Sequence, residues 1–333
     1  MKKVLQQNWP AVLITLVVAI VIVRQSIPLV NKKPSADINN VYDSSWVSPS
    51  LYTDRELEGN QRELVIYGQK LIAHTSVYLG PNGTVAALSN GMNCQNCHLN
   101  AGKKTWGNNY GAVAATYPRF RERSGTIETM YKRVSDCFER SLNGRAPDST
   151  SLEYKAIEAY IRWVGKDIPK GVTPKGTGIT KLKFLDRAAN PEKGKAVYQQ
   201  HCQSCHGTDG KGQLAPGGME YEYPPLWGPN SYNSGAGLNR LSRFAGYVYS
   251  NMPNNKATHD NPVLTVEESW DVAAYVNSQP RPSKDLSGDW PDISKKPIDH
   301  PFGPYADGFS ETQHKYGPYP PILAKREELK KLK

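Results

Sequence analysis

The pattern Cys-x-x-Cys-His occurs twice in this 333-residue chain. Two thiols at this spacing can form thioether bonds with one haem, and the histidine that follows is thereby delivered to the iron. A zinc site or a redox-active dithiol requires no histidine directly after the second cysteine, and neither predicts the pattern twice. The motifs therefore predict two covalently bound haem c groups. The predicted cofactor-binding residues are Cys94, Cys97, His98, Cys202, Cys205 and His206.

The two motifs lie 108 positions apart, which is about the length of chain that wraps one haem in helices. Helix-like apolar spacing precedes each motif, at Glu63 to Ile72 and at Lys193 to Tyr198. An amphipathic helix is expected at the end of each module, at Leu152 to Val164 and at Val266 to Val276. Because no stretch shows convincing strand alternation, the predicted fold is all-α, with two cytochrome c-like domains in tandem.

Glycines and prolines divide the chain further. They mark the stretch 165–190 as a linker, and nine prolines in 280–321 argue against any long regular element there. The predicted divisions are a signal anchor (1–33), a linker (34–60), a first cytochrome c domain (61–168), an interdomain linker (169–190), a second cytochrome c domain (191–280) and an extended tail (281–333).

The first 33 residues contain five basic residues, no acidic residue and an uncharged run from Trp9 to Val23. This run is shorter than the ~20 residues that span a bilayer, but Ile27 to Val30 can lengthen it if Arg24 reaches the interface. A cleavable signal peptide would need a small-x-small site after the apolar core, and none follows. We expect a periplasmic protein tethered to the inner membrane by residues 9–30. A cleaved, soluble periplasmic protein is the alternative.

The formal net charge of +10 is concentrated at the ends of the chain. Residues 1–33 supply five positive charges, and residues 322–333 combine five basic with two acidic residues. The body of the chain is therefore close to neutral, and nucleic-acid binding is not supported.

The ligand opposite each histidine decides what that haem does, because axial ligands shift its reduction potential. In the second module, Met252 follows His206 by 46 positions and suits the sixth coordination site. Met219, the other methionine of this module, lies in a loop rich in glycine and proline. Met252 could also be an ordinary core residue. We expect His206 and Met252 to bind the second iron and to raise its potential.

Cys137 is left over once four of the five cysteines bind haem, and an odd cysteine in an exported protein requires an explanation. We expect one helix from Thr126 to Asn143, on which Arg133, Cys137 and Ser141 share a face. Cys137 could be a small apolar core residue, but a core stripe would not flank it with arginine and serine. We therefore expect Cys137 to bind the first iron opposite His98. Arg133 would then bind a small oxyanion beside it.

The stretches 117–125 and 136–144 closely resemble the dihaem thiosulfate dehydrogenases, also called tetrathionate synthases. The resemblance extends over about residues 60–280. It implies that two thiosulfates are joined into tetrathionate with release of two electrons, or that the reverse reaction occurs. It also implies an external electron carrier, such as a small cytochrome c or a membrane electron donor. The first domain is then catalytic and the second transfers electrons.

Individual residues take roles from this resemblance. Cys137 would be both the distal ligand and the residue that leaves iron to form a sulfur adduct with thiosulfate. Arg123 and Arg133 match the pocket arginines of the family, and Ser141 matches its pocket serine. Several relatives have lysine directly before the methionine and can exchange the two on the second iron. This chain has Asn251 there, so we expect permanent methionine ligation.

Three other functions remain open at this stage. A non-catalytic, membrane-anchored dihaem electron-transfer cytochrome would use Met130 rather than Cys137 as the distal ligand. A haem subunit of a cysteine S-thiosulfotransferase would also place cysteine on iron, but its partner would be the cysteine of a carrier protein. A dihaem peroxidase would turn over peroxide.

Overall fold

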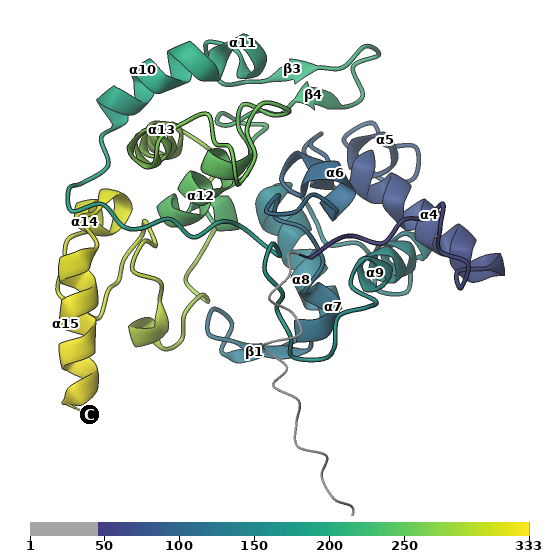
Figure 1. Cartoon of the computed structure of the whole chain (residues 1–333), viewed down its shortest axis with the longest axis horizontal. Coiled ribbons are helices and arrows are strands. Elements are labelled where there is room, and N and C mark those ends of the chain that lie inside the picture. Colours follow the sequence, from purple (N-terminus) through teal and green to yellow (C-terminus); the bar gives the residue numbers. More distant parts are fainter. Residues whose placement is uncertain (1–45, 333) are drawn as a thin grey trace, which may run out of the picture. The chain divides into compact units, whose positions relative to one another are not determined.

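The computed structural model describes residues 46–332, which form mostly helices joined by long loops (Figure 1). The first module contains α4 (Gly59–Ala73), α5 (Thr75–Leu79), η1 (Cys94–Asn96), α6 (Leu99–Gly102), α7 (Val113–Thr116), β1 (Arg119–Arg121), β2 (Thr126–Glu128), α8 (Met130–Asp136), η2 (Cys137–Ser141) and α9 (Leu152–Val164). The second contains α10 (Pro191–His201), α11 (Gln203–His206), β3 (Gln213–Leu214), β4 (Tyr221–Tyr223), η3 (Gly237–Asn239), α12 (Leu241–Asn251) and α13 (Val266–Ser278). The tail contains η4 (Ile293–Lys295), α14 (Glu311–Tyr316) and α15 (Pro320–Lys331).

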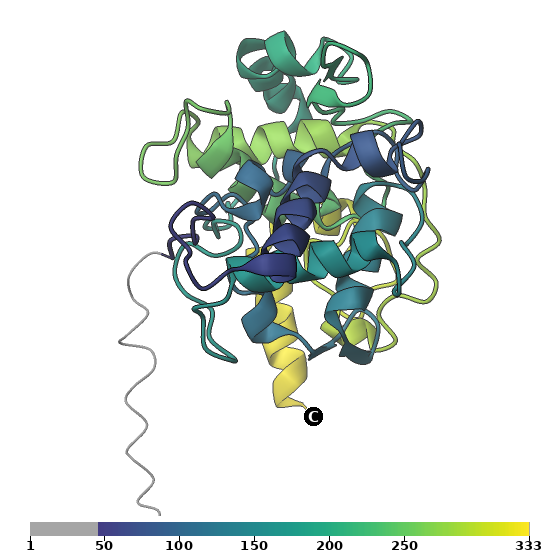
Figure 2. The ribbon, with the colours of Figure 1, turned by 90° about the vertical axis from the view of Figure 1, so that its right-hand side faces the viewer.

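The two modules are built in the same way, each around a crossing of its first and last long helices. In the first, α4 crosses α9, as Figure 2 shows, and in the second α10 packs against α13. A glycine stands at each crossing because a side chain would collide there. A Cβ atom on Gly68 would lie 2.0 Å from the carbonyl oxygen of Ala156, and one on Gly194 would lie 1.9 Å from that of Asp271. The helices expected before and after each motif are thus present.

Each module has its own apolar core. Tyr160 and Phe138 are buried in the first, and Trp270 is buried in the second. The tail contributes to the second core through Tyr319 and Ile322, which are 2% and 0% exposed. The end of the tail is therefore part of the folded second module.

Short strands interrupt the expected all-α fold. β1 and β2 pair antiparallel with Arg119 opposite Glu128, and β3 and β4 form a second hairpin. Strands of two or three residues are too short to show alternation in a sequence. The expected single helix from Thr126 to Asn143 is wrong, because its first residues form β2 and the helix begins at Met130.

The predicted linkers and tail also differ from the structure. Trp46 and Leu57, in the predicted linker 34–60, are buried in the first core. The predicted extended tail 281–333 is wrong in its last part, since the prolines stand before or at the start of α15 and allow that helix to continue. Residues 169–190 contain no helix or strand.

The predicted anchor over residues 1–33 lies outside the described residues. Within residues 46–332, no helix is long and apolar enough to cross a membrane.

The modules contact each other close to the first motif. The Tyr247 hydroxyl donates to the carbonyl oxygen of Asn96 at 3.1 Å, and Asn251 Nδ2 donates to that of Trp106 at 3.0 Å. Helix α12, which carries Tyr247 and Asn251 and precedes Met252, is thereby held against the first module.

Candidate functional site

The first motif presents a histidine that is ready to bind a metal. Cys94 to Asn96 form the short turn η1, and Cys97 and His98 follow it directly. His98 Nδ1 lies 2.5 Å from the carbonyl oxygen of Asn108, so the ring donates through Nδ1 and Nε2 stays available. Burial lowers the pKa of His98 to about 4, so the imidazole is neutral at neutral pH.

The second motif has the same arrangement beside a larger cavity. His206 Nδ1 lies 2.9 Å from the carbonyl oxygen of Pro224, and burial lowers the pKa of this histidine as well. The cavity has a volume of about 970 Å³ and is lined by Cys202, Cys205, His206 and Met252. The predicted thiols, proximal histidine and distal methionine therefore surround one space.

Both motif sites fit a covalently bound haem c. No disulfide joins any of the five cysteines, so both motif pairs are available to attach a haem. Burial raises the pKa of Cys94, Cys97 and Cys202 to about 12, which keeps these thiols neutral. The larger cavity also touches residues on either side of the first motif, including Asn93 and Asn96. The two cofactor sites thus share a wall.

A smaller cavity of about 220 Å³ lies against the first motif and collects the predicted catalytic residues. Its lining includes Arg123, Arg133, Cys137 and Ser141, together with His98. These residues come from the β1–β2 hairpin, from α8 and η2, and from the motif itself. The structure therefore brings together all the residues that the sequence nominated for catalysis.

Local structure at the end of α8 positions Cys137. The Thr129 hydroxyl caps the start of α8 by accepting from the backbone N–H of Lys132 at 3.2 Å. At the other end, the N–H of Leu142 donates to the carbonyl oxygen of Cys137 at 3.0 Å, which makes η2 a π turn. Such turns are rare and occur often at functional sites. Cys137 is the first residue of this turn.

The two predicted arginines of the pocket, Arg133 and Arg123, differ in whether a carboxylate pairs with them. The pKa of Arg133 is raised above its ordinary value, chiefly by the nearby Cys137, although burial acts in the opposite direction. Within residues 46–332, the Arg133 guanidinium has no hydrogen-bond or ion-pair partner. Arg123, by contrast, forms an ion pair with Asp136 that leaves its side chain 12% exposed. Of the two predicted arginines, Arg133 is therefore free of ion pairs among the described residues, and Arg123 is held in place.

Met130, the alternative distal ligand, lies elsewhere. It is 5% exposed in the core of the first module and does not line the pocket that holds Cys137. Its position is that of a core methionine.

Sequence reasoning missed several residues of this pocket. Arg240 and Arg243 reach it from the start of α12 in the second module, and Trp290 reaches it from the tail. Arg121 also lines it, although the sequence analysis did not single this arginine out. The abundance of arginine before Cys137 was the only signal for Arg121. No local pattern identifies the other three.

Comparison with protein families divides the chain at the same places. A family model described as SoxA/TsdA, cytochrome c domain, matches residues 84–169. A second, described as cytochrome c, matches residues 191–280. The tail after residue 280 lies outside both matches.

Curated proteins match over most of both modules. The chain is 36% identical to the thiosulfate dehydrogenase of Allochromatium vinosum over 232 residues, which are 68% of this chain and 81% of that protein. It is 35% identical to the thiosulfate dehydrogenase of Stutzerimonas stutzeri, over 66% of this chain and 68% of that one.

A solved structure has the same fold. The thiosulfate dehydrogenase (TsdBA) of Marichromatium purpuratum, in its "as isolated" form, is 33% identical to the chain with a TM-score of 0.65. The likeness covers 76% of this chain and about half, 52%, of that protein.

Proposed function

This chain belongs to the thiosulfate dehydrogenase family and is an oxidoreductase with two covalently bound haem c groups, and on that premise we propose how its residues divide the work. Two thiosulfate ions are joined through their outer sulfur atoms into tetrathionate, and two electrons leave. The first module carries out this step and the second passes the electrons on. The same site can act in reverse on tetrathionate.

The observation that carries the proposal is the meeting of Cys137, Arg133 and His98 in one pocket. Cys137 and His98 stand 39 positions apart in the sequence, yet both line this pocket. We assign Cys137 as the distal ligand of the first iron and as the sulfur that engages thiosulfate. Among the described residues of the first module, the other sulfur-bearing residue that lines this pocket is the motif residue Cys97, and Met130 does not line it.

Arg133 and Arg123 supply the positive charge that offsets the repulsion between two thiosulfate ions. Thiosulfate is a dianion, and two dianions at 4 Å repel each other by about 17 kcal/mol even at an effective dielectric constant of 20, four times the value for two unit charges. Arg133 has no partner among residues 46–332, so its charge is available to the substrate. Arg123 offers a planar guanidinium that is already oriented by Asp136. Together they offset the repulsion and align the two sulfur atoms.

Ser141 completes the first-module part of the pocket. It lies on the π turn that Cys137 begins, and its hydroxyl can donate to a sulfonate oxygen. Its contribution is orientation rather than charge.

The second module is arranged to carry electrons away. Each haem c, when bound, accepts and releases one electron at a time. Met252 and His206 line the same cavity, which fits a His/Met-ligated iron of raised potential. Residues around the first motif also line this cavity, so electrons would pass directly from the first haem site to the second. An external carrier, such as a small cytochrome c or a membrane electron donor, then takes the electrons.

The proposed location follows from the N-terminal segment and from the covalent attachment of haem to cysteine. We place the protein in the periplasm, tethered by residues 9–30, or released there if the segment is cleaved. Its partners are thiosulfate, tetrathionate and the electron carrier.

Replacement of Cys137 tests the proposal. The haem-loaded Cys137→Gly and Cys137→Met variants should lose activity by at least about a hundredfold, both in thiosulfate oxidation and in tetrathionate reduction. The low-spin ferric thiolate signal in electron paramagnetic resonance should disappear from the first haem only. Full activity in either variant would contradict the proposal.

The same assays separate the remaining functions. Turnover with thiosulfate alone argues against a cysteine S-thiosulfotransferase, which needs the cysteine of a carrier protein. Rapid peroxide turnover would indicate a dihaem peroxidase. A wild-type protein that is inactive in every assay but passes electrons would be a plain electron-transfer cytochrome.

A further inference from the structure

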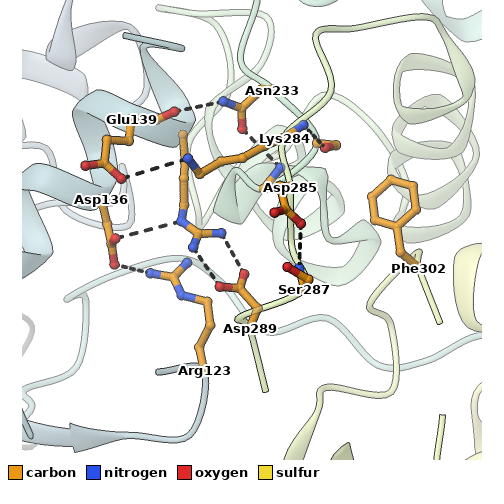
Figure 3. Close-up of polar contacts among 12 residues, drawn as sticks. Arg123, Asp136, Glu139, Asn233, Lys284, Asp285, Ser287, Asp289 and Phe302 are labelled. Atoms are coloured by element: carbon orange, nitrogen blue, oxygen red, sulfur yellow. Dashed lines mark hydrogen bonds and ion pairs between the residues drawn. The ribbon is translucent and has the colours of Figure 1, made fainter. Parts of the chain in front are cut away.

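Residues 284–291 of the tail, which we call the strap, contact the first module, and Figure 3 shows Asp289 of the strap near Arg123 and Asp136. Asp289 accepts two hydrogen bonds from Arg140, from Nη1 and from Nη2, each at 2.7 Å. The next residue, Trp290, donates its backbone N–H to the carbonyl oxygen of Arg123 at 2.7 Å. The strap lies outside both family matches and was expected to be a surface tail.

A buried carboxylate links the two contacts of the strap. Asp136 is 1% exposed and forms ion pairs with Arg123 and, at 2.5 Å, with Lys132. Arg140 Nε lies 3.8 Å from the same carboxylate. Burial would raise the pKa of Asp136, but the charges of Arg123 and Lys132 lower it, so the group is ionised.

Asp289 determines which carboxylate the Arg140 guanidinium binds. The side chains of Arg140 and Asp289 are 10% and 11% exposed, so water screens this pair little. A bidentate contact fixes the plane of a guanidinium as well as its position. With both terminal nitrogens of Arg140 bound to Asp289, only its Nε lies near Asp136, on the Oδ1 that Lys132 also binds, and Oδ2 is left to Arg123. Without Asp289, Arg140 would turn to Asp136 and compete with Arg123 for it.

The strap also fixes the backbone on which Arg123 stands. Besides the hydrogen bond from Trp290, the ring of Pro291 fills the space beside Gly125 in the β1–β2 hairpin. A Cβ atom on Gly125 would lie 2.8 Å from Pro291 Cγ. Trp290 has a φ of +63°, an uncommon conformation for a bulky residue that persists only where surrounding contacts hold it. Its indole lines the catalytic pocket.

We propose that Asp289 is a positioning residue for Arg123, so that the strap is a working part of the anion-binding pocket. It acts by two routes, through Arg140 and Asp136 on the guanidinium and through Trp290 on the backbone. The identity of the anion as thiosulfate rests on the proposed function above. The structural linkage between the strap and the hairpin does not.

The test uses the full-length, haem-loaded protein with Asp289→Ala. We expect KM for thiosulfate to rise about tenfold while kcat changes by less than about threefold, because the arginine remains present but is no longer held. Hydrogen exchange of the backbone amides in residues 119–128 should become faster. The absorption spectra of both haems should stay unchanged, because no proposed iron ligand is touched.

Asp285→Ala is the matched control. Asp285 is an exposed carboxylate on the same strap, and its hydrogen bond is to the backbone N–H of Ser287 at 2.9 Å, within the strap (Figure 3). This variant loses the same charge four residues away and should keep both the KM and the exchange rates of the wild type.

Two further variants keep the test decisive. Asp289→Glu retains the carboxylate and should recover most of the loss in KM, whereas Asp289→Asn keeps the shape, loses the charge and should recover little. If Asp289→Ala does not fold or load haem, the comparison of KM between Asp289→Glu and Asp289→Asn tests the same proposal. An unchanged KM in Asp289→Ala and Asp289→Asn would overturn the proposal. If the wild type fails to oxidise thiosulfate, the proposed function fails, while the exchange measurement still decides whether the strap holds the hairpin.

Discussion

At the scale of single residues, the two predicted pocket arginines differ in what holds them. The Arg123 side chain is bound to Asp136 and its backbone is bound to the strap. Arg123 therefore contributes a fixed orientation of its guanidinium more than net positive charge. Arg133 is half-buried next to Cys137 and has no partner within residues 46–332, so it offers an unneutralised charge. Substrate binding should depend on both, but for different reasons.

Removing the charge of Arg133 should therefore affect catalysis strongly. We expect Arg133→Met to lower kcat/KM for thiosulfate by about 10² to 10³, because the repulsion between two dianions is then opposed by one cation fewer. Steady-state kinetics at several ionic strengths measure the effect. Arg119→Met is the control, since Arg119 is exposed on β1 and lies outside the pocket. Equal losses in the two variants would mean that only the general charge of this face matters.

The sequence allowed part of this site to be predicted for a clear reason. Cys137 is an odd cysteine, and Arg133 and Ser141 stand near it at helical spacing, so local sequence carried the information. Arg243 and Trp290 stand more than a hundred positions away. Which distant residue faces a pocket depends on the packing of whole modules, and no short pattern encodes it.

At the scale of elements, the segment that carries Cys137 contains sequence signals for a helix and for a strand. Thr126 to Asn143 has helix-like spacing, but the β-branched residues Thr126 and Ile127 follow the tight turn at Gly125 and pair with β1. Thr129 then caps a new helix. The boundary could have been found from Thr129, whereas the π turn at Cys137 has no sequence signature.

Helix α12 depends on a cap that comes from the tail. Its N-cap residue, Arg240, has no capping side chain of its own. Asp299 takes that role, accepting from the N–H of Ser242 at 3.1 Å and from Arg240 Nε and Nη2 at 2.9 and 2.6 Å. Asp299 is 1% exposed. Because α12 carries Arg240 and Arg243 to the pocket and leads to Met252, this cap supports both sites.

Asp299→Asn should destabilise the protein in a way that depends on pH. Burial would raise the pKa of Asp299, but Arg240 and Ser242 lower it below its ordinary value of 3.8. The stabilisation is therefore fully present above about pH 4 and is lost as pH falls through the lower pKa of the folded state. We expect a loss of about 2 to 3 kcal/mol in the free energy of unfolding at neutral pH.

Urea unfolding at a series of pH values measures this. The difference between wild type and Asp299→Asn should stay constant above about pH 5 and narrow below about pH 4. Asp186→Asn, at an exposed position, should differ from wild type by less than about 0.5 kcal/mol. A difference that persists unchanged at pH 3 would show that shape, rather than charge, accounts for the role of Asp299.

At the scale of the whole molecule, the tandem arrangement was the easiest feature to predict and the tail the hardest. Two complete motifs at a spacing of 108 residues allow little except two haem modules. The tail is rich in proline and lacks long periodic segments, which predicts an extended tail on the surface. It is instead attached through contacts scattered along it, such as Asp289 on the first module and Asp299 and Ile322 on the second. Such point contacts leave no periodic trace in a sequence.

The division of labour between the modules can be tested at Met252. His206 and Met252 line one cavity, and a His/Met iron has a higher potential than a bis-histidine iron. Met252→His should lower the potential of the second haem by a sizeable fraction of the ~0.8 V that axial ligands span. Electron delivery to the external carrier should slow, while thiosulfate should still perturb the spectrum of the first haem. Met219→His is the control, because Met219 is 39% exposed on the loop between β3 and β4. A potential that falls in Met219→His but not in Met252→His would reverse the ligand assignment.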